Sequence, residues 1–324
     1  MSNKILVTGA AGFIGSHLVE NLVKNSHNVI AFDRYNTDSN FGWLENSKYR
    51  KDIEFVFGDL RDFDSVSKVM KKSKKCIHLA ALIGIPYSYI SPLAYLKTNV
   101  EGTYNILESA RIYSHDDVII TSTSEIYGTA QYTPMDEKHP ISPQSPYAAS
   151  KVASDQLAMT YYRSFDLPVK IIRPFNVFGP RQSPRAIIPT IINQLLLGST
   201  LSLGNINVSR DYTYVDDVVN AFIAILESKK VYGNILNVGT NKNIEIKDII
   251  EIVSKKLNRK IKINIDKKRI RPDKSEVKIL HCDNSKIQKM TNWKNKNSFN
   301  QGINRTIKWN LKFLKEFKSN YYYV

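Results

Sequence analysis

The stretch Lys4-Ile-Leu-Val-Thr-Gly-Ala-Ala-Gly-Phe-Ile-Gly15 begins as a short apolar run and ends in a helical pattern. Ile5 to Thr8 is typical of a buried strand, and apolar residues at helical spacing follow from Phe13 to Lys24. Gly9, Gly12 and Gly15 separate the two patterns. Glycine lets the backbone turn tightly and lets a pyrophosphate approach the helix amino terminus, where free amides favour anions. The stretch therefore predicts a dinucleotide-binding strand, turn and helix.

Strand and helix patterns alternate along the chain outward from this turn. Apolar runs at 29–32, 53–57 and 76–79 are separated by helical patterns, and further buried strands are expected at 118–121, 169–172 and 235–238. This alternation predicts an α/β fold with a Rossmann-type, doubly wound parallel sheet. Glycine and proline interrupt the later part more often, which predicts a smaller C-terminal α/β lobe. We place the dinucleotide-binding domain mainly at 1–173, with 211–240 returning to it, and the smaller lobe mainly at 174–324.

Composition narrows the classes of partner. The chain has 324 residues, 42% of them hydrophobic, so it can bury a sizeable core. The 46 Lys and Arg exceed the 30 Asp and Glu, but the cations are scattered, so we expect a solvated basic surface and no nucleic-acid partner. Cys76 and Cys282 are too few for a disulfide framework and favour a reducing cytoplasm. We expect no targeting segment and no membrane insertion, because Met1 to Lys4 lead directly into a strand and no apolar stretch is long enough.

Acidic residues end the second and third predicted strands. Asp33 lies eighteen residues after Gly15, in a position to accept both hydroxyls of an adenosine ribose. A carboxylate repels a 2′-phosphate and so favours NAD, whereas the neighbouring Arg34 could accommodate NADP. Asp59 is a candidate adenine contact, although an ordinary turn aspartate fits that position equally well.

Two clusters of proton-transfer groups follow. Thr123, Ser124 and Glu125 come directly after the predicted strand 118–121, at the edge where parallel sheets bind ligands. Tyr147 and Lys151 share one helix face, so the ammonium is expected to lower the pKa of the phenol until it serves as a base near neutrality. One base suffices to oxidise an alcohol. Glu125 supplies a second proton acceptor, which indicates chemistry that continues after hydride transfer.

Together these residues resemble the extended short-chain dehydrogenase/reductase family, and the resemblance covers essentially the whole chain. The matching motifs are the glycine turn, Leu79-Ala80-Ala81, Asn99, Ser-Glu-x-Tyr-Gly at 124–128, the Tyr147 and Lys151 pair, Arg173-Pro-Phe-Asn176-Val-Phe-Gly-Pro-Arg181, and Arg210-Asp-Tyr-Thr-Tyr-Val-Asp-Asp217. More narrowly, the chain looks like the nucleotide-sugar 4,6-dehydratases of bacterial legionaminic acid biosynthesis. The segments that carry this are Tyr35-Asn36, Phe41-Gly-Trp-Leu44, Ile85-Pro-Tyr-Ser-Tyr89, Gly128-Thr-Ala-Gln-Tyr132 and Pro180-Arg-Gln-Ser183.

The resemblance implies a set of site residues. NAD, with NADP as the alternative, would be held by Gly9, Gly12, Phe13, Ile14, Gly15, Asp33, Arg34, Asp59, Leu60, Leu79, Ala80, Ala81, Asn99, Tyr147 and Lys151. A nucleotide-diphospho sugar would be bound by Tyr87, Asn176, Arg181, Arg185, Arg210 and Arg271, whose guanidinium groups suit phosphate oxygens. No metal site is expected. The family also implies a homodimer that pairs the Tyr147 helix and the helix at about 98–113 with their copies.

The implied reaction converts a nucleotide-linked hexose, with GDP- or UDP-linked N-acetylglucosamine favoured, into its 4-keto-6-deoxy derivative. Tyr147 takes the O4 proton, Thr123 hydrogen-bonds O4, and Glu125 takes the C5 proton as water leaves C6. Ser124 departs from the wider dehydratase pattern, which commonly has aspartate there as the acid for the leaving hydroxyl. Three alternatives stay open, namely a UDP-glucuronate decarboxylase, a nucleotide-sugar 4-epimerase and a non-catalytic dinucleotide-binding regulator.

Overall fold

A seven-stranded sheet dominates the computed structural model of the protein, which describes residues 3–313. Every neighbouring pair of its strands runs parallel. The predicted Rossmann-type α/β fold is therefore confirmed. In spatial order the strands are β10 (Ile235–Val238), β6 (Val169–Pro174), β5 (Asp117–Thr121), β4 (Lys75–His78), β1 (Ile5–Thr8), β2 (Val29–Arg34) and β3 (Ile53–Gly58).

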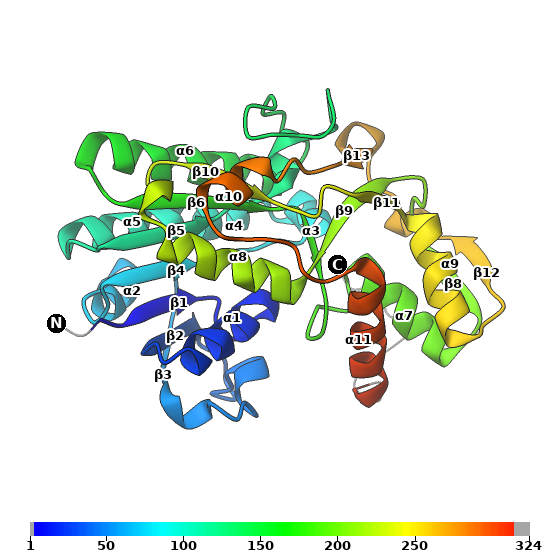
Figure 1. Ribbon diagram of the computed structural model, residues 1–324, viewed down its shortest axis with the longest axis horizontal. Coiled ribbons are helices and arrows are strands. Elements are labelled where there is room, and N and C mark those ends of the chain that lie inside the picture. The colour runs from blue at the N-terminus through cyan, green and yellow to red at the C-terminus, as the bar shows by residue number, and fades with distance from the viewer. Residues whose placement is uncertain (1–2, 314–324) are drawn as a thin grey trace.

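Helices cover both faces of this sheet (Figure 1). Alternate strand residues point to opposite faces, so Val7 packs with the core on one side and Leu6 with the core on the other. The first face carries α1 (Phe13–Lys24) and α8 (Val215–Glu227), which contact each other. The second face carries α2 (Phe63–Met70), α5 (Gly102–Ile112) and α6 (Pro146–Phe165).

Short helical turns connect these elements. Between β4 and α5 the chain forms α3 (Ile85–Ile90), α4 (Pro92–Tyr95) and a π-helix at Leu96–Glu101 that runs directly into α5. The 3₁₀ turns are at Gly42–Leu44, Arg50–Asp52, Ser124–Tyr127, Lys229–Val231, Lys267–Arg269 and Asp273–Ser275.

A smaller lobe faces the carboxyl ends of the parallel strands (Figure 1). Its core is continuous with the first face of the sheet, because Phe178, Ile191 and Ile303 belong to the same buried cluster as Val7. One of its sheets contains β7 (Asn176–Phe178), β9 (Ser209–Tyr214), β11 (Asn243–Glu245) and β13 (Ile279–Leu280), and the other pairs β8 (Thr200–Leu203) with β12 (Lys262–Ile265). Its helices are α7 (Ile187–Leu197), α9 (Ile246–Leu257), α10 (Ser285–Met290) and α11 (Phe299–Lys312).

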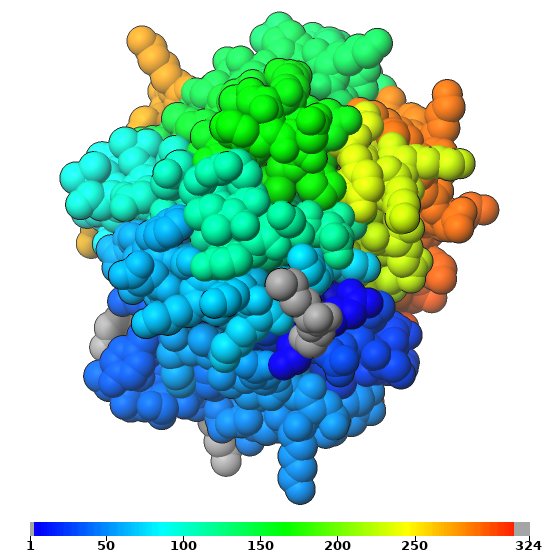
Figure 2. Space-filling view, turned by 90° about the vertical axis from the view of Figure 1, so that its left-hand side faces the viewer, coloured from blue at the N-terminus to red at the C-terminus, as the bar shows by residue number. Residues whose placement is uncertain are grey.

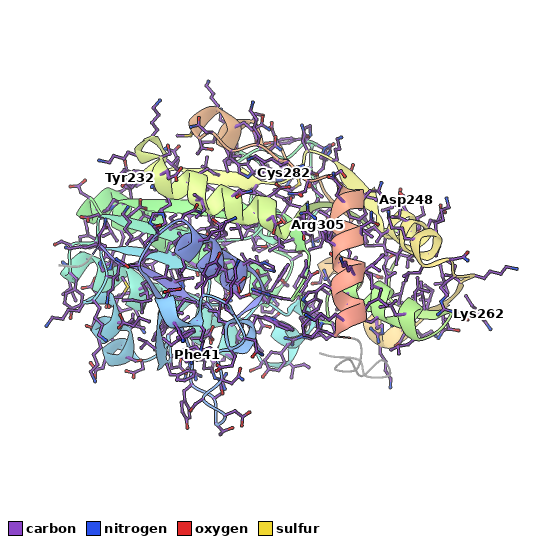
Figure 3. All side chains as sticks on the ribbon, turned by 60° about the horizontal axis from the view of Figure 1, so that its bottom comes forward. Phe41, Tyr232, Asp248, Lys262, Cys282 and Arg305 are labelled. Atoms are coloured by element: carbon purple, nitrogen blue, oxygen red, sulfur yellow. The ribbon has the colours of Figure 1, made fainter. Side chains whose placement is uncertain are left out.

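The amino ends of the strands lie on the side that faces the viewer in Figure 2. A buried ion pair stands here, with Lys170 Nζ 2.6 Å from Asp117 Oδ2. Lys170 also donates to the carbonyl of Ile225 at the end of α8, and Tyr232, labelled in Figure 3, donates to the Asp116 carbonyl. These contacts join the carboxyl end of α8 and the segment before β10 to the amino ends of β5 and β6. The glycine turn lies at the opposite ends of the strands.

Three further observations concern residues 3–313. None of their helices is long and apolar enough to cross a membrane. They contain no group of three or more His, Cys, Asp and Glu side chains that could hold a metal ion. Cys76 and Cys282 are both free and buried.

Candidate active site

The glycine turn between β1 and α1 is as tight as the sequence predicts. Gly9 has φ +67°, and a Cβ atom there would lie 2.8 Å from the backbone nitrogen of Ala80. A Cβ on Gly15 would collide with the Gly9 carbonyl oxygen. The backbone after β4 is therefore packed directly against the turn, which brings the predicted residues Leu79 to Ala81 to the same place as the glycines.

A loop from the β2–β3 connection lies against this turn. The backbone nitrogen of Trp43 donates to the Ala11 carbonyl at 3.4 Å. Phe41, labelled in Figure 3, stacks on Phe57 with ring centroids 3.9 Å apart and anchors the loop to β3. The loop is thus fixed at one side of the predicted cofactor position.

Asp33 ends β2 beside the glycine turn. Its Oδ2 accepts a hydrogen bond from the Ala11 backbone at 2.7 Å, and its Oδ1 accepts one from the Arg34 backbone at 2.8 Å. Burial raises the pKa of this half-buried carboxyl. The arrangement joins the predicted ribose-binding carboxylate to the predicted phosphate-binding turn.

Asp59 has a strong partner of its own. The carboxylate lies 2.5 Å from Arg61 Nη2, and this pairing lowers its pKa. Its predicted contact with adenine stays a prediction. Leu60, which follows it, is buried and packs against Gly102, while Phe13 and Ile14 pack on the core at the start of α1.

The Tyr147 helix begins at a well-formed cap. The side chain of Ser145 accepts a hydrogen bond from the Ala148 backbone at 3.1 Å, and Pro146 occupies the first helical turn. Asn99 in the π-helix donates to Ser150 Oγ at 2.9 Å, and Ser150 Oγ donates to the Tyr147 carbonyl at 2.7 Å. These bonds hold the helix start against the loop that follows β4. Tyr147 is 7% exposed and Lys151 is 3% exposed.

The structure corrects the expected pKa of Tyr147. Burial raises this pKa, and the negative charge of Glu125 raises it further, whereas a hydrogen bond with the Thr123 side chain lowers it. Burial also lowers the pKa of Lys151 to about 8. The attraction between ammonium and phenolate can be inferred from their helical spacing, whereas the loss of solvation that both groups suffer in a closed site depends on the tertiary fold. The prediction of a phenol already activated by Lys151 is wrong for the chain by itself.

The residues after β5 meet the Tyr147 helix. Thr123 caps the 3₁₀ turn Ser124–Tyr127, because its Oγ1 accepts a hydrogen bond from the Glu125 backbone at 3.2 Å. Ser124 is buried and Glu125 is half-buried. Since Thr123 bonds to Tyr147 and the charge of Glu125 acts on Tyr147, the predicted catalytic groups Thr123, Glu125 and Tyr147 lie together.

Arg210 and Arg271 of the smaller lobe lie near Tyr212 of β9, and Tyr212 lies near Glu125. Burial raises the pKa of Tyr212 to about 12, the charges of Arg210 and Arg271 lower it, and that of Glu125 raises it. Arg210 is buried and donates to the carbonyls of Ser209, Val277 and Lys278. Glu276 lies 3.6 Å from Arg210 and 3.7 Å from Arg271. The structure thus gathers Arg210 and Arg271 near the predicted second base.

Asn176 and Tyr87, two further predicted substrate residues, differ in their burial and contacts. Asn176 begins β7, and its Oδ1 is buried with no hydrogen-bond partner among residues 3–313. Tyr87 is 38% exposed and packs on Tyr95, whose ring contacts that of Tyr147 at a centroid distance of 6.2 Å.

Two arginines of the turn after β7 have separate surroundings. The charge of Arg185 lowers the pKa of Tyr95, although burial raises it overall. Arg181 instead pairs with Glu20 of α1 at 2.9 Å and has φ +69°. Its role in substrate binding stays a prediction.

Sequence reasoning missed Tyr95, Tyr212 and Asp155. Tyr95 and Tyr212 reach the site through tertiary contacts that no local pattern reports. Asp155 had a signal, because it follows Lys151 by one further helical turn on the same face as Tyr147.

The chain is similar to known proteins over nearly its whole length. A family model described as GDP-mannose 4,6 dehydratase matches residues 6–306. The chain belongs to this family. It is part of the extended short-chain dehydrogenase/reductase group of nucleotide-sugar dehydratases and epimerases, so the broader resemblance is confirmed. The narrower likeness to legionaminic acid enzymes stays a prediction.

Relatives within the family include both dehydratases and epimerases. A UDP-glucuronate 4-epimerase from Thermodesulfobacterium geofontis is 32% identical over 97% of this chain and 98% of its own length. A dTDP-D-glucose 4,6-dehydratase from Homo sapiens is 30% identical over 95% of this chain and 90% of its own. Among solved structures, the dTDP-glucose 4,6-dehydratase DesIV from Streptomyces venezuelae, with NAD and TYD bound, superposes with a TM-score of 0.86. It is 29% identical and covers 97% of this chain and 99% of that chain.

Proposed function

We propose that the protein is an NAD-dependent nucleotide-sugar 4,6-dehydratase, a hydro-lyase. The observation that carries the proposal is the placement of Glu125 with Thr123 and Tyr147 at the carboxyl edge of the sheet. A 4-epimerase needs one base at O4, whereas elimination of water needs a second base at C5. We assign the role of that second base to Glu125.

The residues present fit NAD as the cofactor. Backbone contacts exclude a side chain at Gly9 and at Gly15, so the turn at the amino terminus of α1 offers backbone in the position where a pyrophosphate would bind. Asp33 supplies a carboxylate for the ribose, which favours NAD over NADP. Asn99, Tyr147 and Lys151 would hold the nicotinamide half. When bound, NAD accepts hydride from C4 of the sugar and returns it to C6.

Tyr147 is the proposed base of the first step. It removes the proton from O4, and Thr123, whose side chain lies beside that of Tyr147, would turn its hydroxyl to hydrogen-bond O4 as charge changes there. Because burial raises the pKa of Tyr147, the chain by itself does not provide an activated phenol. The positive charge of oxidised nicotinamide, together with Lys151, would lower that pKa when the cofactor is in place.

Glu125 is the proposed base of the second step. The 4-keto group acidifies the hydrogen on C5, Glu125 removes it, and hydroxide leaves C6 as water after protonation. Ser124 is buried beside Glu125, and an unperturbed serine is a poor acid. We therefore assign the protonation of the leaving hydroxyl to Glu125 itself, which passes on the proton that it took from C5. As hydride is added to C6, C5 regains a proton from solvent through Glu125, and Tyr147 releases to solvent the proton that it took from O4, so the net change is the loss of one water.

The nucleotide-sugar class is proposed from the arginines and the family. The charges of Arg210 and Arg271 act on Tyr212 beside Glu125, and Glu276, which lies between the two guanidinium groups, offsets one of them, so the pair leaves a net positive charge for a diphosphate. The unpartnered Oδ1 of Asn176 would accept a hydrogen bond from a ligand hydroxyl. We favour GDP- or UDP-linked N-acetylglucosamine, as in legionaminic acid biosynthesis, with dTDP-glucose as the competing substrate that the relatives suggest.

A homodimer is the proposed assembly. Large apolar side chains are exposed along the continuous helix that runs from α4 to α5, at Leu93, Leu96, Tyr104 and Ile112. α6 packs beside α5, and Phe165 is exposed at its end. A second copy of the chain would cover both helices. Sedimentation of the wild type and of Tyr104→Glu tests this, since the substitution should shift a dimer towards monomer.

The reaction is tested by incubating the purified protein with NAD and, separately, GDP-GlcNAc, UDP-GlcNAc, dTDP-glucose and UDP-glucuronate. A product lighter by one water, with no net change in NAD, supports the proposal. A product of unchanged mass but altered configuration would show a 4-epimerase instead. Release of carbon dioxide from UDP-glucuronate would show a decarboxylase.

A further inference from the structure

Asp155 is a buried carboxylate on α6 that the proposed reaction does not use. It lies on the same helix face as Tyr147 and Lys151, and its side chain is 0% exposed. Oδ2 accepts hydrogen bonds from Ser122 Oγ at 2.8 Å and from Arg173 Nε at 3.0 Å. Oδ1 is also buried but has no hydrogen-bond partner among residues 3–313.

These hydrogen bonds reach both ends of the turn that carries Glu125. Ser122 directly precedes the capping residue of that turn, and its backbone nitrogen is fixed to the Ile172 carbonyl of β6 at 2.7 Å. Arg173 reaches the far end, because its Nη1 donates to Tyr127 Oη at 2.8 Å and Tyr127 is the last residue of the turn. Asp155 therefore joins the helix that carries the first base to the turn that carries the second.

The negative charge of Asp155 also acts on Lys151. Both Lys151 and Arg173 are buried cations, and Asp155 supplies negative charge to both. Burial lowers the pKa of Lys151, and Asp155 opposes that change. Tyr147 lies one turn before Lys151 on the same helix, and the charge of Lys151 also acts on His78 of β4. Burial lowers the pKa of His78 to about 3, so this ring adds no positive charge near neutral pH.

We propose that Asp155 is a positioning residue that fixes the Glu125 turn against the Tyr147 helix face and balances the buried charge of Lys151 on that face, which supports cofactor binding. Its effect on catalysis rests on the proposed dehydratase function, whereas its effect on NAD binding does not. The two parts can therefore be tested separately.

The first test measures NAD affinity by calorimetry between pH 6 and pH 9.5 for the wild type and Asp155→Asn. Asp117→Asn is the matched control, because Asp117 is also a buried carboxylate paired with a buried lysine, but at the opposite end of the strands. In Asp155→Asn we expect the alkaline loss of affinity to begin about one pH unit lower or more, because a neighbouring opposite charge shifts a pKa by about that much. Asp117→Asn should keep the wild-type curve. Superimposable curves for all three proteins would overturn the assignment.

The second test uses Ser122→Ala and Tyr127→Phe, which keep the Asp155 charge and each remove one tie to the turn. We expect both variants to bind NAD as the wild type does. Elimination of water should become slower while the rate of C4 oxidation is kept, so reduced nicotinamide should accumulate. Equal slowing of both steps, or of neither, would contradict the positioning role. If Asp155→Asn does not fold, these two variants decide the proposal. If the wild type accepts no nucleotide sugar, the dehydratase proposal fails and the NAD titration still decides the role of Asp155.

Discussion

Replacing Glu125 with glutamine separates the two proton transfers that the proposed reaction requires. Glutamine has nearly the same shape and cannot act as the base at C5, while the cap of the turn is kept because it uses the backbone nitrogen of residue 125. Loss of a positioned base costs about 10²- to 10⁴-fold in rate, or about 3 to 5 kcal/mol of transition-state stabilisation. Dehydration should therefore fall by that factor while C4 oxidation continues.

C4 oxidation, the first step, should become easier in Glu125→Gln at low pH, whereas dehydration becomes slower. The negative charge of Glu125 raises the pKa of Tyr147, so its removal lowers that pKa and lets the phenol lose its proton at lower pH. The acid limb of C4 oxidation should move to lower pH in Glu125→Gln. Stopped-flow absorbance of reduced nicotinamide, followed from pH 5 to pH 9, reports this step, and mass spectrometry of the sugar reports the loss of water.

Glu137→Gln is the control for these measurements. Glu137 is also a partly buried glutamate, but it accepts a hydrogen bond from the Asn237 backbone at 2.8 Å and has no place in the proposed reaction. It should keep both rates and the wild-type pH profile. Wild-type release of water by Glu125→Gln, or the absence of any reduced nicotinamide in that variant, would refute the assignment of the second base.

Three further predictions concern other parts of the structure. Tyr147→Phe should lose C4 oxidation while it still binds NAD, which a binding isotherm and the nicotinamide absorbance together check; normal oxidation would exclude Tyr147 as the base. Gly15→Ala should abolish NAD binding, because the new methyl group collides with a carbonyl oxygen of the turn, whereas Gly198→Ala, whose nearest neighbour is 4.0 Å away, should bind normally. Asp117→Ala should lower the free energy of unfolding by about 3 to 5 kcal/mol, because it leaves the buried ammonium of Lys170 without its counter-charge; a urea midpoint equal to that of the wild type would contradict this.

Local features of the fold follow from the sequence. The apolar run before Gly9 and the helical pattern after it predict β1 and α1 at the bounds that the structure has. The collision that any side chain at Gly15 would meet explains why glycine alone serves there. Short-range sterics and periodicity decide these elements, so a single sequence suffices to predict them.

Partners that are distant in sequence could not be predicted in the same way. Nothing near Arg181 in the sequence indicates that it pairs with Glu20, and nothing near Arg210 indicates that three backbone carbonyls occupy its guanidinium group. The prediction that the pKa of Tyr147 is lowered was wrong for a related reason. Its attraction to Lys151 is visible as helical spacing, whereas its burial depends on side chains from other elements, such as Tyr95.

The place of β10 at the edge of the large sheet has a consequence for synthesis of the chain. β10 pairs with β6 and ends at Val238, and α8, which precedes it, covers α1. A nascent chain that has reached residue 174 therefore has six strands but lacks the seventh and one covering helix. More than sixty further residues must leave the ribosome before β10 can pair with β6. Until then the backbone groups along the free edge of β6 have no partner strand, so we expect a chaperone or the ribosomal surface to cover β6 during that interval.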